Sequence, residues 1–235
     1  MAQVNFSGGK DSCVLKDISI KAGINATFVF CNTTNEAPEL IKFIREYHKD
    51  VKWVRPEKPL IKAIIDKNIL PTRIARWCCR THKKNPLIKA GYKIDIVGVR
   101  GEESNKRKLG RMIGIRGGKK TGRILLSPIF NWNTADIWEY IDKFKIPYCS
   151  LYDEPNFERI GCVVCPLRSW NVQKFWIKRY PKIFRAFEKA VCKHFAKKPE
   201  YFKSRGCPNG HILFYRWLRG EKLLGEPNPT SGMLI

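Results

Sequence analysis

The most constraining feature of the sequence is a six-residue turn near its start, Ser7-Gly8-Gly9-Lys10-Asp11-Ser12. Residues 3–6 before it are expected to form a strand, and residues 11–21 after it a helix that Gly23 closes. A parallel sheet presents ligands where its strands end and its helices begin. The turn therefore restricts the chain to α/β folds that use this edge of the sheet.

Strand-like and helical segments alternate after the turn. Apolar, β-rich runs at 26–31, 51–54, 94–99 and 124–127 predict four more strands, and helical spacing is found at 36–48, 60–88 and 134–144. Residues 100–123 contain nine Lys/Arg and two acids around Gly117-Gly118, which predicts a mobile loop. The expected fold is doubly wound α/β with a mostly parallel five-stranded sheet and a helical C-terminal region.

The C-terminal region differs in composition from the preceding part. Residues 168–205 contain twelve Lys/Arg and two acids, on two helices separated at Pro181. Their aromatic residues recur at helical spacing, which favours a core, with stacking on nucleic-acid bases as the alternative. We expect a nucleotide-binding α/β domain over 1–148, and a cysteine-bearing loop with basic helices packed on it over 149–235.

The chemistry of the turn suits phosphate. Gly8 and Gly9 lack Cβ atoms, so that backbone N–H groups can approach an anion, and the helix N-terminus adds partial positive charge. Lys10 supplies a full charge, Ser7 and Ser12 supply hydroxyl donors, and Asp11 could hold Mg²⁺ or cap the helix. The pattern is neither a Walker A loop nor the dinucleotide G-x-G-x-x-G motif. The alternative is an ordinary glycine-rich connection.

The charge balance predicts an anionic partner. Lys and Arg number 45 against 21 Asp and Glu, a formal net charge of +24. Such a field attracts nucleic acid first and nucleotides second, and the alternative is a solvated surface that aids solubility. No apolar run approaches the roughly 18 residues of a membrane span, and the first residues lack a signal-peptide pattern, so we expect a cytoplasmic protein with no membrane partner.

Four of the nine cysteines form a metal-like pattern, Cys78-Cys79 and Cys162-x-x-Cys165. Without a secretory signal, metal or redox use is favoured over disulfides. Zinc usually takes two C-x-x-C pairs, whereas adjacent cysteines suit an iron–sulfur cluster, whose iron corners are spread apart. Structural zinc and unligated buried thiols remain the alternatives.

The turn resembles the S-G-G-x-D-S motif of the PP-loop, or adenine nucleotide α-hydrolase-like (HUP-type), superfamily. Four longer segments resemble the phosphoadenylyl-sulfate (PAPS) reductase family within it. They are C-C-x-x-x-K-x-x-P-L at 78–87, G-x-R-x-x-E-S-x-x-R at 98–107, P-I-x-x-W-x-x-x-D-I-W at 128–138, and L-Y…R-x-G-C-x-x-C-P at 151–166. The resemblance covers residues 4 to about 168.

The resemblance implies a set of site residues. In the family's iron–sulfur branch the four cysteines hold a [4Fe–4S] cluster, which here implies Cys78, Cys79, Cys162 and Cys165 as ligands. It implies ATP or an adenylyl sulfate, (P)APS, at the turn, with Arg100 and Arg107 on its phosphosulfate or ribose. Thr33, Thr34 and Asn35, after the second strand, are implied to lie near the base or ribose.

The sequence departs from the family at one position. Reductases of the family carry a nucleophilic cysteine in an E-C-G-[IL]-H segment, and the nearest match here is Gly206-Cys207-Pro208-Asn209-Gly210-His211. Cys207 and His211 could form a thiolate–imidazolium pair, and a turn with a buried thiol is the favoured alternative.

Three functions follow as hypotheses. The first is ATP-dependent sulfur insertion into DNA or tRNA, the second PAPS or adenylyl-sulfate reduction, and the third a non-enzymatic redox regulator that binds nucleotide or nucleic acid. The candidate catalytic residues are Lys10, Asp11, Arg100 and Cys207. A sulfur donor or reductant protein is the expected partner, and the sequence leaves a homodimer open.

Overall fold

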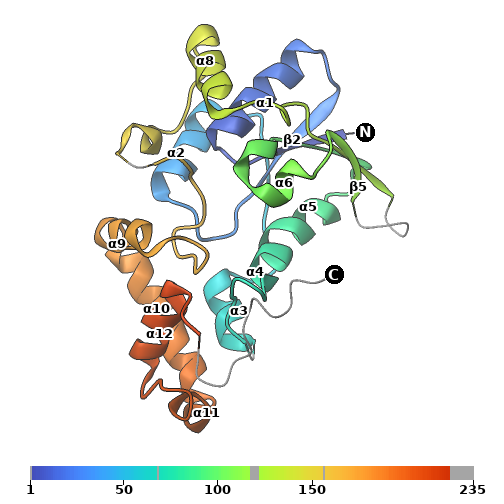
Figure 1. Cartoon of the computed structure of the whole chain (residues 1–235). Helices are drawn as coiled ribbons and strands as arrows, with labels where there is room; N and C mark the ends of the chain where they lie inside the picture. Colours follow the sequence, from blue (N-terminus) through green and yellow to red (C-terminus); the bar gives the residue numbers. More distant parts are fainter. Residues whose placement is uncertain (1, 68, 117–121, 156, 223–235) are drawn as a thin grey trace. The chain divides into compact units, whose positions relative to one another are not determined.

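The computed structural model describes residues 2–67, 69–116, 122–155 and 157–222 (Figure 1). The chain divides into two compact units that alternate along the sequence. Unit 1 comprises Met1–Asn32, Glu36–Arg55 and Lys83–Gly161, and unit 2 comprises Thr33–Asn35, Pro56–His82 and Cys162–Ile235. Among the described residues, no helix is both long and apolar enough to cross a membrane.

Unit 1 is built on a six-stranded sheet in the order β3-β2-β1-β4-β6-β5. The strands are β1 (Ala2–Phe6), β2 (Ala26–Cys31), β3 (Lys52–Val54), β4 (Ile94–Val97), β5 (Ile113–Arg116) and β6 (Arg123–Leu126). Five of them pair in parallel, and β5 runs antiparallel to β6 at one edge. The α/β fold with a mostly parallel sheet is therefore confirmed.

One expectation for unit 1 is corrected. The sequence predicted five strands and a mobile loop over 100–123, but residues 113–116 of that segment form the edge strand β5. Two short helical turns, Gly101–Glu103 and α6 (Asn105–Lys108), precede it. Gly117-Gly118, at the centre of the predicted loop, lie outside the described residues.

The first helix joins the sheet to a second helical layer. Unit 1 contains α1 (Lys10–Lys21), α2 (Pro38–Tyr47), α5 (Asn85–Lys89), α8 (Thr134–Phe144) and a 3₁₀ turn, η3 (Ser150–Asp153). On α1, Leu15 packs with Val4 and Ile96 of the sheet. Its neighbour Val14 packs with Ile137 of α8, among others. Apolar contacts on both sides fix the axis of α1, and with it the turn at its N-terminus.

A buried ion pair links the middle strands. Arg123 of β6 donates to both carboxylate oxygens of Asp95 on β4, at 3.1 and 2.6 Å. The side-chain amide of Gln3 on β1 also donates to Asp95. All three side chains are buried. Because two hydrogen bonds join the guanidinium to the carboxylate, the pair fixes the position of β6 relative to β4 in the sheet.

Unit 2 is helical. It contains α3 (Leu60–Asp66), α4 (Trp77–Cys79), α9 (Trp170–Arg179), α10 (Pro181–Ala196), α11 (Pro199–Lys203) and α12 (Gly210–Arg219), and the π-turn Arg80–Lys84 crosses the boundary between the units. The predicted helical stretch 60–88 is thus several short elements. Gly210 lets α12 approach α10 closely, because a Cβ there would lie 2.6 Å from the Cα of Cys192.

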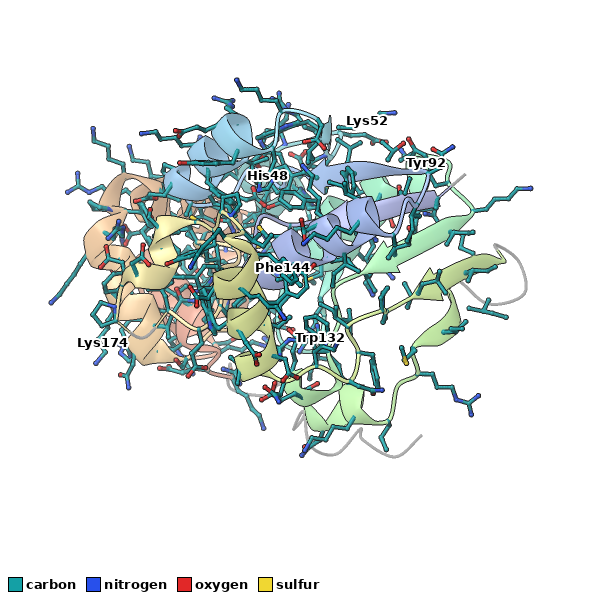
Figure 2. All side chains as sticks on the ribbon, turned by 90° about the horizontal axis from the view of Figure 1, so that it is seen from above. His48, Lys52, Tyr92, Trp132, Phe144 and Lys174 are labelled. Atoms are coloured by element: carbon teal, nitrogen blue, oxygen red, sulfur yellow. The ribbon has the colours of Figure 1, made fainter. Side chains whose placement is uncertain are left out.

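The positive charge is distributed differently in the two units. Lys52 of unit 1 and Lys174 of unit 2 point outward, like most lysines and arginines (Figure 2). Among the described residues, the buried cations are Lys10, Lys16, Arg100 and Arg123, and all four belong to unit 1. Since a buried cation needs a partner, unit 1 holds fixed counter-charges: Asp11 and Glu102 at the turn, and Asp50 and Asp95 elsewhere in the unit.

Candidate functional site

The turn adopts a conformation that requires glycine. Gly8 has φ +73°, in the left-handed region. A Cβ on Gly8 would lie 2.6 Å from Leu40 and 2.8 Å from Ile44, both on α2. Conformation and space therefore both exclude a larger residue. In the described part of the chain, the backbone N–H groups of Gly8 and Asp11 have no hydrogen-bond acceptor, so they can bind an anion.

Two serines hold the turn in shape. The Ser12 hydroxyl donates to the Gly9 carbonyl at 2.8 Å and accepts from the Ser7 backbone N–H at 3.1 Å. The Ser7 hydroxyl lies 3.1 Å from that of Ser12 and accepts from the Gly9 N–H. Both serines, predicted to contact phosphate, thus also have a scaffolding role. The backbone of the turn is therefore held by hydrogen bonds with its own side chains.

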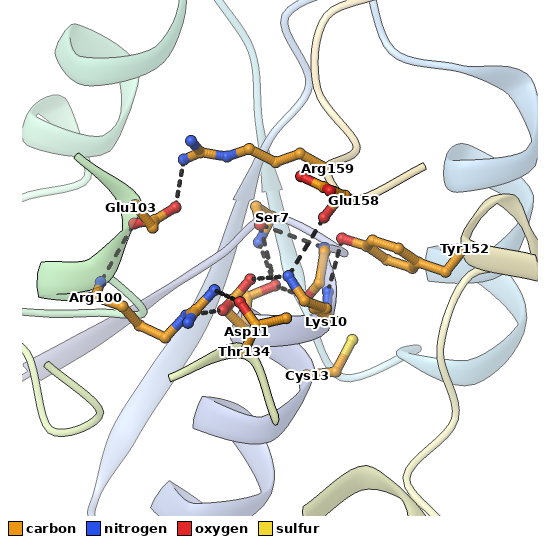
Figure 3. A network of polar contacts seen from close by, with 12 residues as sticks. Ser7, Lys10, Asp11, Cys13, Arg100, Glu103, Thr134, Tyr152, Glu158 and Arg159 are labelled. Carbon is orange, nitrogen blue, oxygen red and sulfur yellow. Dashed lines mark hydrogen bonds and ion pairs between the residues drawn. The ribbon is translucent and has the colours of Figure 1, made fainter. Parts of the chain in front are cut away.

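Lys10, Asp11 and Arg100 form one charged group (Figure 3). The Asp11 carboxylate lies 2.5 Å from Arg100 Nε and 3.3 Å from Lys10 Nζ. Arg100 also pairs with Glu102 at 2.6 Å and donates to the Thr134 hydroxyl at 3.2 Å. The structure therefore brings together the three predicted catalytic residues of unit 1. Asp11 orients both cations, and Arg100 is held by several acceptors at once.

The carboxylate of Glu103 forms ion pairs with two more arginines near the turn. Glu103 pairs with Arg107 and Arg159 and accepts from the Arg100 backbone N–H at 3.2 Å. Burial lowers the pKa of Arg107, and the neighbouring Arg159 lowers it further. Around the turn, four cations (Lys10, Arg100, Arg107 and Arg159) thus meet three carboxylates (Asp11, Glu102 and Glu103). The excess is positive, which favours an anionic ligand.

Tyr152 is a site residue that the sequence reasoning missed. Its hydroxyl accepts a 3.1 Å hydrogen bond from the Lys10 backbone N–H, in the first turn of α1. The Lys10 ammonium lies 5.7 Å from the centre of its ring (Figure 3). Burial raises the pKa of Tyr152, so the phenol stays protonated. In the described part of the chain no acceptor takes its proton, which leaves an O–H donor at the turn. The only sequence signal was the matched L-Y pair.

A second cluster of polar side chains, largely buried, surrounds Lys16 on α1. Lys16 Nζ contacts His48 Nδ1 at 3.2 Å and Asp50 at 2.5 Å. His48 Nε2 lies 3.9 Å from the sulfur of Cys13. Burial, together with Lys16, lowers the pKa of His48 from 6.5 to about 4, and burial raises the pKa of the Cys13 thiol. At neutral pH the imidazole and the thiol are therefore neutral.

Thr33, Thr34 and Asn35 belong to unit 2. The Thr34 hydroxyl accepts from the Leu60 backbone N–H at 3.1 Å, and Thr34 itself has φ +68°. The Asn35 amide bonds reciprocally with the backbone of Val164, at 2.8 and 3.0 Å. Asn35 thus fixes the loop between Cys162 and Cys165. The predicted contact of these three residues with the base or ribose stays a prediction.

The four motif cysteines all lie in unit 2 and are half-buried. A hydrogen bond with Cys79 raises the pKa of Cys78, and burial and the charges of Cys79, Cys162 and Cys165 raise it further. The thiols are thus close enough to influence one another. Four thiols are a donor set that suits iron or zinc. However, within the described residues no group of three or more His, Cys, Asp or Glu side chains has the arrangement of a metal site.

The predicted nucleophile lies elsewhere in unit 2. Cys207 is fully buried, and Arg216 contacts its sulfur at 3.8 Å. His211 is exposed and pairs with Glu188 at 3.0 Å. A substrate cannot reach the thiol in this arrangement, and the imidazole is engaged with a carboxylate. These contacts fit the alternative of a buried structural thiol better than a thiolate–imidazolium pair.

Comparison with known proteins finds a family match that includes most of the site residues. The phosphoadenosine phosphosulfate reductase domain family matches residues 2–168. That range contains the turn, the Arg100 segment and all four motif cysteines. It ends before α9, so the helices α9 to α12 lie outside the match.

Individual relatives agree with this match. The chain is 33% identical over 204 residues to an uncharacterised protein of Methanocaldococcus jannaschii, covering 83% of this chain and 42% of that protein. It is 30% identical over 167 residues to an adenosine 5′-phosphosulfate reductase of Halalkalibacterium halodurans, covering 68% and 71%. The chain thus spans less than half the length of the first of these relatives.

A solved structure supports the fold. The phosphoadenylyl-sulfate reductase of Candida auris, in its phosphate complex, superimposes with a TM-score of 0.53 at 20% identity. The overlap covers 68% of this chain and 80% of that one. At this identity the likeness establishes the fold alone.

Proposed function

Because the chain belongs to the phosphoadenosine phosphosulfate reductase domain family, we propose that it binds an adenine nucleotide at residues 7–12 and activates an oxygen for replacement by sulfur. The nucleotide is ATP, and the acceptor is a nucleic acid. The observation that carries this proposal is the glycine turn with its free N–H groups, enclosed by four cations. This arrangement suits a ligand with several linked anionic groups, as in a nucleotide polyphosphate.

The reaction has two displacement steps. An acceptor oxygen attacks the α-phosphorus of ATP, so that an O–P bond forms, the bond to the β-phosphate bridge breaks, and pyrophosphate leaves. A sulfide-level nucleophile then displaces AMP from the activated acceptor, which forms a bond to sulfur without oxidation or reduction of the acceptor. The protein's contribution to the first step is charge: Lys10 and Arg100 stabilise the phosphates, and Asp11 orients both side chains.

Cys78, Cys79, Cys162 and Cys165 would hold the iron–sulfur cluster of this family's iron–sulfur branch. Their thiol chemistry and their mutual effect on pKa support this assignment. Ligation requires deprotonated thiols, so cluster binding would have to offset the raised pKa values of Cys78 and Cys165 and draw the four cysteines into a tighter arrangement. When bound, such a cluster supplies redox-active iron and a place for sulfur.

The second candidate is reduction of adenosine 5′-phosphosulfate or its 3′-phosphate. The relatives that are named as such reductases favour it. In that reaction a thiolate attacks the sulfate sulfur and AMP, or its 3′-phosphate, leaves. The burial of Cys207 counts against this chain's own thiol in that role.

One experiment separates the two candidates. The reconstituted chain is incubated anaerobically with ATP and sulfide, with and without duplex DNA or tRNA, and pyrophosphate is measured. Parallel samples receive adenosine 5′-phosphosulfate, or its 3′-phosphate, together with a thiol reductant, and sulfite is measured. We expect acceptor-dependent pyrophosphate release. Sulfite release that needs Cys207 would establish the reductase instead, and neither product would contradict both candidates.

Two variants tie the activity to the turn. Arg100→Lys keeps the charge but loses the fork that joins Asp11 to Glu102, and should lower the rate about 10²-fold. Lys42→Ala removes an exposed lysine of α2 from the same unit and should leave the rate unchanged. An equal loss in both variants would show that the effect is not specific to the turn, and would contradict the proposed role of Arg100.

A further inference from the structure

The solvent side of α10 carries a regular row of cations, Lys182, Arg185, Lys189 and Lys193, which we call the α10 stripe. All four are exposed. They are spaced by three, four and four residues, so at about 100° per residue they lie within an arc of about 80°. The stripe is therefore one continuous face of the longest helix of unit 2, drawn in orange in Figure 1.

The opposite side of α10 is anchored in the core of unit 2. Its buried residues are Phe184, Phe187, Ala190, Val191 and His194. Helices α3 and α12 pack against α10. Because this side is fixed by packing, the stripe is held in one orientation and does not depend on a loose segment.

The stripe has no counter-charge of its own. In the described part of the chain, none of its four cations makes an ion pair. Glu188 is the single acid of α10, and it is engaged with His211 at 3.0 Å. The neighbouring helices differ, since Lys203 of α11 pairs with Glu200 and Arg219 of α12 with Glu221.

This arrangement does not favour helix stability. Arg185 and Lys189 repel each other four residues apart, as do Lys189 and Lys193. Lys182 lies in the first turn, where the helix dipole disfavours a cation, and that turn has no acid. A surface selected only for stability would alternate these positions with glutamate. The missing negative charge therefore points to a partner outside the chain.

We propose that the α10 stripe binds the phosphodiester backbone of a nucleic acid. Eleven residues of helix at about 1.5 Å each give a stripe of roughly 16 Å. The same length of duplex axis presents about five phosphates of one strand, at roughly 3.4 Å each. Four unpaired cations can therefore each reach a phosphate, without reading base sequence. The inference rests on the proposed nucleic-acid acceptor and assigns it a surface.

The test compares two quadruple variants of the full chain. The stripe variant carries Lys182→Ala, Arg185→Ala, Lys189→Ala and Lys193→Ala. The control variant carries Lys42→Ala, Lys49→Ala, Lys52→Ala and Lys93→Ala, four exposed lysines of unit 1. Both lose the same net charge, and circular dichroism with thermal melting checks that both fold. Binding of labelled duplex DNA, single-stranded DNA and tRNA is measured by anisotropy between about 50 and 200 mM salt.

We expect the stripe variant to bind at least 10-fold more weakly than the unchanged protein. Its log-affinity against log-salt slope should fall by about 3, since each lost phosphate contact contributes about 0.7 to 0.9. The control variant should keep most of the affinity and slope. The labelled nucleic acid that binds with the highest affinity identifies the kind of nucleic acid whose backbone the stripe binds.

Three outcomes overturn the proposal: equal losses in the two variants, no binding by the unchanged protein, or equally stripe-dependent binding of polyglutamate. Pyrophosphate release from ATP with saturating acceptor is measured on the same variants. If the stripe variant loses binding while this release persists, the surface assignment stands with the proposed function. If release is absent in all proteins but stripe-dependent binding remains, the proposed reaction fails and the surface still stands.

Discussion

The phosphate turn of unit 1 and the cysteine region of unit 2 are both organised by the protein, but to different degrees. At the turn, Lys10 and Arg100 already have fixed carboxylate partners, and the serines hold the backbone. The four motif cysteines are half-buried, the pKa values of the Cys78 and Cys165 thiols are raised, and within the described residues the four do not have the arrangement of a metal site. The turn is held by contacts within the protein, whereas the proposed cluster would have to draw the cysteines closer together.

This difference has a physical basis. An anion site can be made from backbone N–H groups and from cations that nearby carboxylates balance, so that it costs little to preform. Four thiolates in one place would repel each other, so if the cysteines bind a metal as we propose, the metal would have to neutralise that repulsion. The two regions should therefore respond in opposite ways to loss of metal and to changes in the backbone.

The largest effect is expected for the cysteines. Cys162→Ser should remove essentially all bound iron and sulfide from anaerobically reconstituted protein, because a cluster that loses one of four ligands is no longer held. Iron and acid-labile sulfide are assayed chemically and normalised to protein. Cys192→Ser, on α10 of the same unit, is the matched control and should retain both.

Zinc without sulfide in the unchanged protein would contradict the cluster assignment and leave a structural zinc. If neither metal binds, the cysteines are unligated thiols and the comparison between the regions fails. Nucleotide affinity, measured on the same Cys162→Ser sample, should change by less than about 3-fold if the turn is preformed.

The next effect concerns the backbone of the turn. Gly8→Val should destabilise unit 1 by about 3 kcal/mol, through the left-handed φ and the collision with Leu40 and Ile44. Nucleotide binding should be lost, while iron content remains. Urea denaturation and nucleotide titration measure the two effects. Gly114→Val on β5, where a Cβ would meet nothing within 4 Å, is the control. Equal effects at the two glycines would show that the turn is not specially constrained.

Much of the fold around the turn could be predicted, because it depends on local patterns. The apolar runs at 26–31 and 94–97 are strands in the structure, and α8 has the predicted bounds 134–144. The edge strand β5 was missed, because its exposed Ile113 and Ile115 are surrounded by glycines and cations that resemble a loop. The predicted helical stretch at 60–88 contains two prolines, and it is divided into short pieces.

The site, like the fold, was predictable where it depends on residues that are close in sequence. The turn could be found because its glycines and charges are contiguous. Arg159 and Tyr152 could not be assigned roles, because their contacts with Glu103 and Lys10 join segments 50 residues or more apart. Similarly, nothing in the sequence indicated that Asn35 fixes the loop of Cys162 and Cys165. Such contacts depend on the three-dimensional arrangement and have no periodic signal.

Acid should weaken unit 1 through His48. Its folded pKa of about 4 lies below the ordinary 6.5, so the unfolded chain takes up the proton first as the pH falls. The stability is therefore complete above pH 6.5 and is lost between pH 6.5 and 4. By pH 5 the loss attributable to His48 should be roughly 2 kcal/mol. Urea denaturation at pH 7 and 5 measures it, and His48→Gln should remove that part of the pH dependence. An unchanged dependence would show that the residual acid effect comes from His82 and His194, whose pKa values burial also lowers.

The smallest effect is expected for Tyr152, and it shows whether the tyrosine hydroxyl contacts the bound nucleotide or obstructs its binding. Tyr152 could donate its free O–H to a phosphate oxygen, or it could occupy the place of that oxygen on the Lys10 N–H. We expect donation, because the hydroxyl can accept from Lys10 and still give its own proton to the ligand. Tyr152→Phe should then weaken ATP binding by about 5- to 10-fold, or about 1 kcal/mol. Tyr148→Phe, which removes a hydroxyl bonded to the exposed side of Asp153 at 3.0 Å, should have no effect. Calorimetric titration measures both, and tighter binding by Tyr152→Phe would mean that the tyrosine hydroxyl occupies the place of a phosphate oxygen and obstructs the turn.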